Sequence, residues 1–207
     1  MKRQWVATVT AVVVIALAMS VMTVVAADDK DKKEVYNAFA VNMGATGPAG
    51  ATTIQITITR WSTEEERAAL LQTLQEKGHK EFMKALRKQK ETGFVEGRGM
   101  GARLNPFPST RIHYAYQVVE KGVRHIMLVT DRPIGMREAA SGSRSLDYDA
   151  TAIQFEFPAE ETEGKKTKGK GALYMALKLS VDKKTKKMKV EEWGNEPVRL
   201  PDIQKLK

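Results

Sequence analysis

The chain contains the stretch Thr53-Ile54-Gln55-Ile56-Thr57-Ile58-Thr59, in which isoleucine alternates with a polar residue at each step. This period of two places the isoleucines on one face of a β-strand and the polar side chains on the other. A second clean alternation links Leu173, Met175, Leu177, Leu179 and Val181. Strands with one apolar face are typical of an antiparallel sheet that covers a core on one side.

Most of the remaining predicted strands are separated by short turns. Glu120-Lys121-Gly122 connects a strand over 112–119 to one over 123–131, and a turn over 182–187 connects 173–181 to 188–193. Further strands are expected over 35–41, 147–157 and 198–200. The glycines and prolines of 93–110 predict irregular structure there. Hairpin connections of this kind imply antiparallel pairing.

A pair of helices is predicted directly after the isoleucine strand. Ser62-Thr63-Glu64-Glu65 has the pattern of a capping box, with Ser62 as the N-cap and Glu65 as its partner. The helix that follows ends near Gly78, and a second helix is expected over 80–88. We therefore predict an α+β fold, mainly antiparallel β with about eight strands and one inserted helical hairpin. The sheet curls into a barrel or a sandwich, and the pattern leaves both open.

The N-terminus has the pattern of a signal peptide. Lys2 and Arg3 precede an uncharged stretch over 4–27 that ends in Val25-Ala26-Ala27. We expect cleavage after Ala27, leaving a single globular domain over 28–207 whose first residues, 28–34, form a disordered leader. The alternative is an uncleaved anchor, because the uncharged stretch is about as long as a bilayer-spanning helix. Cleavage predicts an exported protein, periplasmic or extracellular, with no membrane span in the mature chain.

Composition excludes several kinds of site. The 207 residues include no Cys, which excludes disulfides, thiol nucleophiles, iron–sulfur clusters and zinc sites with cysteine ligands. The chain has 34 Lys and Arg against 25 Asp and Glu, a formal net charge of +9. Its lysine clusters over 165–170 and 183–187 fall at predicted turns and contain no aromatic residue that would stack on bases. We therefore expect no specific nucleic-acid partner, and no motif indicates a cofactor.

Charged and aromatic residues at strand ends form the candidate site. Arg60 and Trp61 follow the isoleucine strand, and Asp131 and Arg132 lie at the end of the strand that begins at Val123. A rigid sheet holds such positions in place, so we predict a ligand-binding or interaction site there, with no catalytic residue. The structural alternative is an ion pair between Arg60 and Asp131, with Trp61 closing one end of the core.

The histidines His113 and His125 join this site because they lie on neighbouring predicted strands. Symmetric pairing about the Glu120–Gly122 turn places His113 opposite Val129, too far from His125 for the two to share a metal ion. Their spacing matches no metal-binding motif, so we predict no metal site. Each is expected to make structural hydrogen bonds, and His79 is expected at the surface.

Two segments of the chain carry a resemblance. The first is Ile58-Thr59-Arg60-Trp61-Ser62-Thr63 followed by Glu65-Glu66-Arg67, and the second is Leu128-Val129-Thr130-Asp131-Arg132-Pro133-Ile134-Gly135. In these segments the chain resembles a group of exported bacterial proteins of unknown function. The likeness covers residues 53 to 157 and implies export, but it brings no activity, ligand or catalytic residue.

These observations favour an exported, non-catalytic protein of the bacterial envelope with a binding or interaction role. One form of that role is carriage of a small apolar ligand by the curled sheet, with the helical hairpin across its opening. The expected partner is therefore an unknown small ligand or an envelope protein. One alternative is a hydrolase with its site at the strand ends near Arg60, Asp131 and His113 or His125. Another is a purely structural or protein-interaction module.

We expect the protein purified from its own cell envelope to begin at Asp28. Denaturing mass spectrometry should then give the mass of residues 28–207, because signal peptidase removes the apolar N-terminal segment. Native mass spectrometry of the same sample should show any additional non-covalent mass. A denatured mass that still includes residues 1–27 would contradict the cleavage.

Overall fold

The computed structural model describes residues 33–43, 50–98, 109–132, 134, 149–159, 167–182, 188–193 and 197–206. The described residues form one helix and nine strands: β1 (Glu34–Asn42), β2 (Gly50–Ile58), α1 (Glu64–Leu86), β3 (Gly93–Arg98), β4 (Thr110–Glu120), β5 (Val123–Thr130), β6 (Ala150–Pro158), β7 (Lys168–Val181), β8 (Met188–Trp193) and β9 (Val198–Lys205). The predicted signal peptide lies outside these residues. Within them, there is no helix whose length and hydrophobicity would let it span a bilayer.

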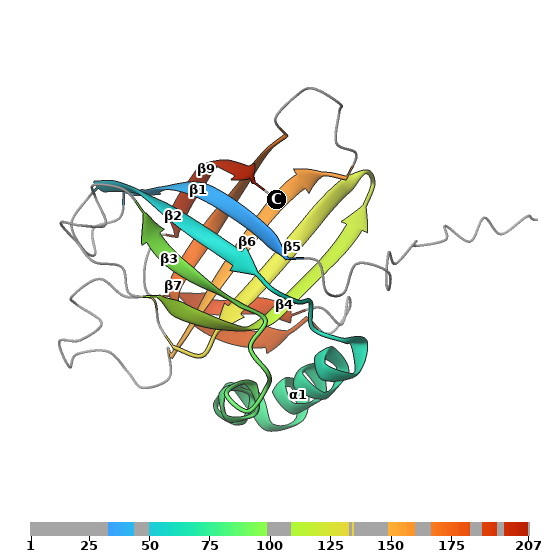
Figure 1. The fold of residues 1–207 in the computed structure, drawn as a ribbon. Helices are drawn as coiled ribbons and strands as arrows, with labels where there is room; N and C mark the ends of the chain where they lie inside the picture. The colour runs from blue at the N-terminus through green and yellow to red at the C-terminus, as the bar shows by residue number, and fades with distance from the viewer. Residues whose placement is uncertain are drawn as a thin grey trace, which may run out of the picture.

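Eight of the strands close into an antiparallel barrel. The sheet runs β6-β5-β4-β3-β2-β1-β9-β7, and a further pairing between β6 and β7 joins its two ends (Figure 1). The long strand β7 carries β8 as an extra strand on its second half, between Leu177 and Val181. The predicted mainly antiparallel β fold is therefore confirmed, and the sheet forms a barrel rather than a sandwich.

An apolar core fills the barrel. The isoleucines of β2 face inward as predicted, and three aromatic rings lie among them: Tyr36, Phe155 and Phe157. The centroid of Tyr36 is 5.1 Å from that of Phe155 and 5.4 Å from that of Phe157, within the range of favourable ring contacts. These rings fit because Gly169 and Gly171 on β7 lack side chains: a Cβ on Gly171 would lie 2.6 Å from Phe155 Cβ.

An ionic cluster lies inside the same barrel. Glu34 on β1 accepts hydrogen bonds from Tyr36 Oη at 2.5 Å and from Arg124 Nη2 of β5 at 2.8 Å. Burial of Glu34 raises its pKa, but these hydrogen bonds and the charge of Arg124 outweigh it and hold the pKa below its usual value. Glu34 falls within the predicted leader, yet it begins β1 and is buried.

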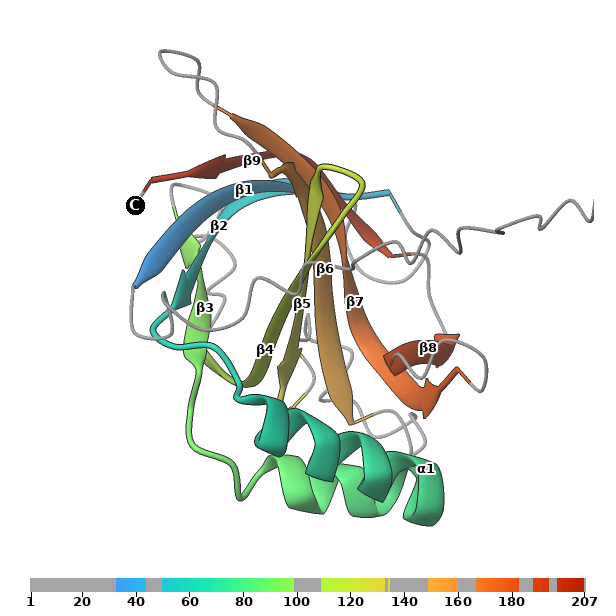
Figure 2. The ribbon, with the colours of Figure 1, turned by 90° about the vertical axis from the view of Figure 1, so that its right-hand side faces the viewer.

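Helix α1 packs on the outside of the barrel wall and extends across its lower end (Figure 2). Its buried face meets outward side chains of β4 to β7 in a second apolar cluster that includes Leu70, Leu74, Phe82, Met83, Leu86, Tyr114, Val129 and Leu177. Gly78, with φ 77° and ψ −176°, breaks α1 into two segments that lie side by side. The predicted helical hairpin is thus found as one sharply broken helix.

Two local predictions differ from the structure. The capping box uses Thr63 and Glu66, one residue later than predicted, because Ser62 instead accepts a hydrogen bond from the Ala115 N–H. Residues 93–98 form β3, which pairs with β2 and β4 despite its glycines. Gly93 is required there, because a Cβ at this position would lie 2.0 Å from the Thr57 carbonyl oxygen.

Replacing Gly171 with Ala should destabilise the barrel by about 1–3 kcal/mol, the usual effect of overpacking a tight core. The added Cβ would collide with the Gln154 carbonyl and with Phe155. Urea unfolding measures the change, and Lys170→Ala, at the exposed neighbouring position, is the control. Equal stability of the two variants would show that the glycine is not needed for ring packing.

Candidate functional site

The outer face of the barrel wall presents an ordered grid of side chains. Directly opposed residues on β4, β5, β6, β7 and β9 form one row across five strands: Tyr116, Met127, Gln154, Ala172 and Arg199. A second row lies beside it and consists of Val118, His125, Glu156 and Lys170. The two rows belong to one face because each strand advances by two residues between them.

A cavity of about 650 Å³ lies over these two rows. Ala172 provides a small residue in the middle of the larger side chains, Arg67 approaches from α1, and Met188 approaches from β8. We call this cavity the outer groove; its floor is the row from Tyr116 to Arg199. Its volume is within the range of about 300–1,000 Å³ that is typical of small-ligand sites.

The lining of the outer groove is mainly apolar and aromatic. Tyr114, Tyr116 and Tyr174 contribute rings, and Met127 and Met188 contribute flexible thioethers. Burial raises the pKa of the Tyr114 hydroxyl far above its usual value, more than the nearby Arg67 charge lowers it, so this group stays protonated. Such a surface suits the apolar part of an organic molecule better than an ion.

The second row supplies charges along one side of the groove. His125 Nδ1 lies 3.4 Å from Glu156 Oε1, and Lys170 is paired in register with Glu156 on the other side. His125 and Glu156 are both substantially exposed, with side chains 40% and 45% accessible. Of the six residues predicted from the sequence, His125 is the one that lines the outer groove.

Arg60 and Trp61 have structural partners. Arg60 donates to Glu66 Oε2 at 2.8 Å, to the Lys90 carbonyl at 2.7 Å and to the Glu91 carbonyl at 3.2 Å. Its ion pair is therefore with Glu66 rather than with Asp131. Trp61 is buried in the core of the barrel, where its ring lies 5.3 Å from the Arg124 guanidinium.

Asp131, Arg132 and His113 meet at the end of β5. His113 Nε2 is 3.7 Å from Asp131 Oδ2, and Arg132 Nε is 3.1 Å from Asp131 Oδ1. The His113 side chain is only 7% exposed, and its Nδ1 donates to the Gln89 carbonyl at 2.9 Å. His113 and Arg60 therefore both hold the segment that follows α1, and the arrangement fits an anchor better than an open site.

The register of the β4–β5 hairpin explains how His113 reaches Asp131. The turn consists of Lys121 and Gly122, both with positive φ, rather than three residues as predicted. This moves the pairing by one residue, so that Tyr114 rather than His113 lies opposite Val129. A bulge between Ile112 and Tyr114 then shifts His113 out of the regular alternation.

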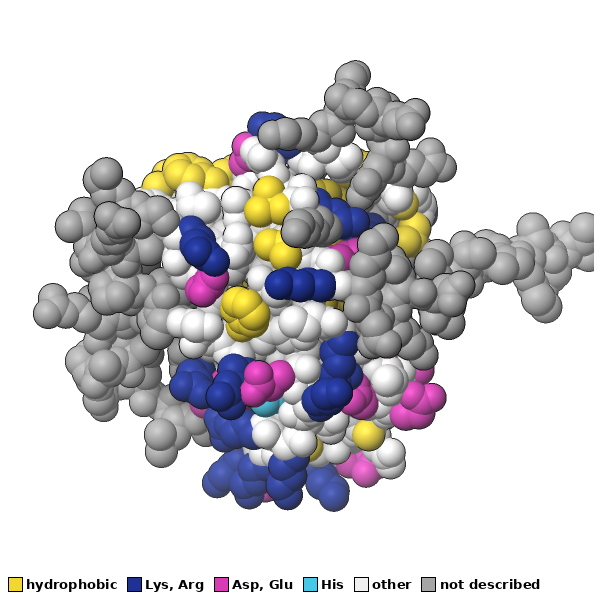
Figure 3. Space-filling model, viewed as in Figure 1, with side chains coloured by type: hydrophobic (Ala, Val, Ile, Leu, Met, Phe, Trp, Pro, Cys, Tyr) yellow, Lys and Arg dark blue, Asp and Glu magenta, His cyan; other side chains and the backbone are white. Residues whose placement is uncertain are grey.

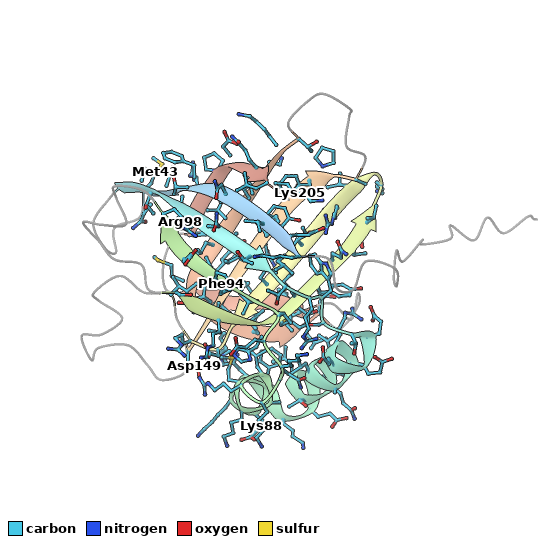
Figure 4. The ribbon with its side chains drawn as sticks, viewed as in Figure 1. Met43, Lys88, Phe94, Arg98, Asp149 and Lys205 are labelled. Atoms are coloured by element: carbon cyan, nitrogen blue, oxygen red, sulfur yellow. The ribbon has the colours of Figure 1, made fainter. Side chains whose placement is uncertain are left out.

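A second histidine, which was expected at the surface, completes the attachment of α1. His79 is buried; its Nδ1 accepts from the Leu179 N–H at 3.1 Å, and its Nε2 therefore donates to Asp149 Oδ1 at 3.0 Å. Arg87 donates to Asp149 Oδ2 at 2.6 Å and to the Asp131 carbonyl at 3.1 Å. Figure 4 shows Asp149 where the barrel wall meets α1. We call His79, Arg87 and Asp149 the helix anchor.

Lysine and arginine side chains gather over the lower end of the molecule, where α1 lies (Figure 3). The exposed outer side of the helix carries Lys77, Lys80 and Lys84, and Lys88 follows just after its end. The hydrogen bond from Lys84 and the charges of Lys84, Lys80 and Lys77 lower the pKa of Glu81. Among the described residues, no group of His, Asp and Glu side chains has the arrangement needed to hold a metal ion.

Asp149→Asn should lower the free energy of unfolding by about 1 kcal/mol near neutral pH. Burial raises the Asp149 pKa, but the hydrogen bonds from His79 and Arg87 outweigh it, and the pKa lies below its ordinary 3.8. A lowered pKa stabilises the folded state above pH 4 or so, and this contribution disappears as the pH falls through the folded-state pKa. Urea unfolding at several pH values should therefore show the wild type and variant converging in acid.

A double-mutant cycle with Arg87→Gln tests the cause of that loss. Because Arg87 and Asp149 are in direct contact, their effects on stability should be less than additive. Strict additivity, or a difference between wild type and Asp149→Asn that persists in strong acid, would contradict the role of the helix anchor.

Comparison with known proteins identified no similar sequence or structure. No protein-family model matches the sequence, no curated protein matches it, and no solved structure matches the fold.

Proposed function

We propose that this protein is an exported, non-catalytic binding protein that holds a small, largely apolar ligand in the outer groove. The observation that carries the proposal is the cavity of about 650 Å³ on the outer wall, lined by three tyrosines and two methionines. Concave, mainly apolar surfaces with a few polar groups are typical of small-molecule sites.

The groove differs from an ordinary sheet surface in the size of its central residue. Ala172 lies between Gln154 and Arg199, whereas the positions around it carry long or aromatic side chains. A flat apolar ligand that extends along this row from Ala172 toward Tyr116 would cross Gln154 and Met127, with Tyr174 beside Ala172 on β7. These contacts remove apolar surface from water at about 25 cal/mol per Å², which is the main source of affinity for such a ligand.

Binding accounts for the polar groups better than hydrolysis does. A histidine that acts as a general base needs a ring nitrogen within reach of a substrate. His113 is buried and donates to the Gln89 carbonyl, and both ring nitrogens of His79 are hydrogen-bonded, to Leu179 and Asp149. His125 is accessible, and it faces the carboxylate of Glu156. Its position at one side of the groove suits the orientation of a ligand.

Export is part of the proposal and is supported by the N-terminal sequence. The basic start, the uncharged stretch and the small residues before Asp28 form the pattern of a cleaved signal peptide. A binding protein of the envelope would meet small apolar molecules that enter or leave the cell. The groove opens on the outside of the barrel wall, so a ligand reaches it without any opening of the barrel.

Ala172→Trp should abolish binding of N-phenylnaphthylamine, an uncharged dye that fluoresces in apolar surroundings. The indole would occupy the space above Ala172, and the half-buried, outward position should leave the core intact. Dye titration followed by fluorescence measures the affinity, and thermal unfolding confirms that the variant is folded.

Ala51→Trp is the matched control, because Ala51 is an exposed residue of β2 and does not line the groove. It should bind the dye as the wild type does. The proposal fails if wild-type protein does not bind the dye, or if the two tryptophan variants bind it equally well.

A further inference from the structure

We infer that the ligand of the outer groove carries an anionic group, a carboxylate, sulfonate or phosphate, and that Arg67 binds it. This inference rests on the proposed function, since it concerns the same cavity. Arg67 Nε is buried and has no hydrogen-bond partner among the described residues. Buried N–H groups are nearly always satisfied, and Arg67 lines the outer groove, so its unsatisfied Nε indicates a missing acceptor.

The position of the guanidinium is fixed by the elements around it. Arg67 lies on the first turns of α1, just after the capping box formed by Thr63 and Glu66. Its guanidinium carbon lies 4.4 Å from the centroid of the Tyr116 ring, so the planar group covers one face of that ring. This stacking is at one end of the groove floor and leaves the edge of the guanidinium for hydrogen bonds.

The acid nearest to Arg67 satisfies it only in part. Glu64 Oε2 is 3.4 Å from Arg67 Nη1, a long contact, and its side chain is 51% exposed. Glu156, farther along the groove, faces His125 at 3.4 Å. Within the part of the chain that the structure describes, the buried Nε therefore has no carboxylate to bind, and a water molecule would fill this role in the free protein.

An anion would replace that water with a stronger interaction. Hydrogen bonds between arginine and a carboxylate or phosphate are charge-assisted, and the planar guanidinium presents two parallel donors to them. The groove also favours negative charge overall, because its lining includes Arg67, Lys170 and Arg199 against Glu120 and Glu156. The ligand class that fits both the floor and Arg67 is an apolar or aromatic molecule with one anionic end.

Two related dyes separate the anion from the apolar contacts. Anilinonaphthalene sulfonate has the ring system of N-phenylnaphthylamine with one added sulfonate. We expect wild-type protein to bind the sulfonate dye about tenfold more tightly than the uncharged dye. Arg67→Gln should remove this preference, while the affinity for the uncharged dye stays within about twofold of the wild type.

Arg111→Gln is the control for net charge. Arg111 is 62% exposed, forms an ion pair with Glu91 and does not line the groove, so this variant should keep the sulfonate preference. Competition against bound sulfonate dye by decanoic acid, decyl phosphate and decanol should rank both anions above the alcohol. The tighter of the two anions then identifies the preferred group.

Each outcome bears on one proposal. If the uncharged dye binds but the sulfonate dye binds no better, or if Arg67→Gln keeps the preference, the anion site is overturned and the apolar groove stands. Decanol competing as well as the two anions would overturn it too. If neither dye binds the wild type, the proposed function itself fails.

Discussion

The packing of Tyr36, Phe155 and Phe157 against the bare backbone of β7 is the constraint on which the rest of the structure depends. The rings occupy the barrel between β1, β6 and β7, and Gly169 and Gly171 allow β7 to approach them closely enough to pair with both β6 and β9. Closure of the sheet and filling of its interior therefore depend on the same contacts. These rings and the isoleucines of β2 fill the core, so the outer groove lies on the barrel wall. Carriage of a ligand within the curled sheet was one of the forms of binding that the sequence left open.

The outer groove forms because α1 packs against part of the barrel wall and leaves the neighbouring part uncovered. The helix anchor ties the second segment of α1 to the ends of β5 and β6, and the buried leucines of the first segment cover the next row of the grid, around Tyr114 and Val129. The helix does not cover the row from Tyr116 to Arg199 or the row from Val118 to Lys170, which together line the outer groove. Arg67 overhangs them from the helix, and Met188 on β8 approaches from β7. The attachment of α1 thus sets both the shape of the outer groove and the position of its buried donor.

Patterns of period two identified most strands correctly, because alternation reports directly which face is buried. Residues 93–98 were missed since glycine has no side chain to alternate, although Gly93 is there to let β3 approach Thr57. The contacts of His113 with Asp131 and of His79 with Asp149 depend on a turn one residue shorter than predicted, a bulge, and the fold of α1 on the wall. None of these is visible in spacing along the chain. A signal for the groove was present, however: Tyr114, Tyr116 and Val118 alternate with Ala115, Gln117 and Val119, so this strand carries large side chains on its outward face as well.

Two arginines near the start of α1 show how a structural residue differs from one that is available to a ligand. Arg60 donates hydrogen bonds to Glu66 and to the carbonyls of Trp61, Lys90 and Glu91, so partners within the fold account for its guanidinium. Arg67 is held in place by Tyr116 and reaches Glu64 only at 3.4 Å, and its buried Nε has no hydrogen-bond partner among the described residues. Burying a donor unsatisfied costs about 1–3 kcal/mol, and an acceptor on a bound ligand would offset that cost. Its retention beside an apolar cavity is explained if the acceptor is supplied from outside the chain.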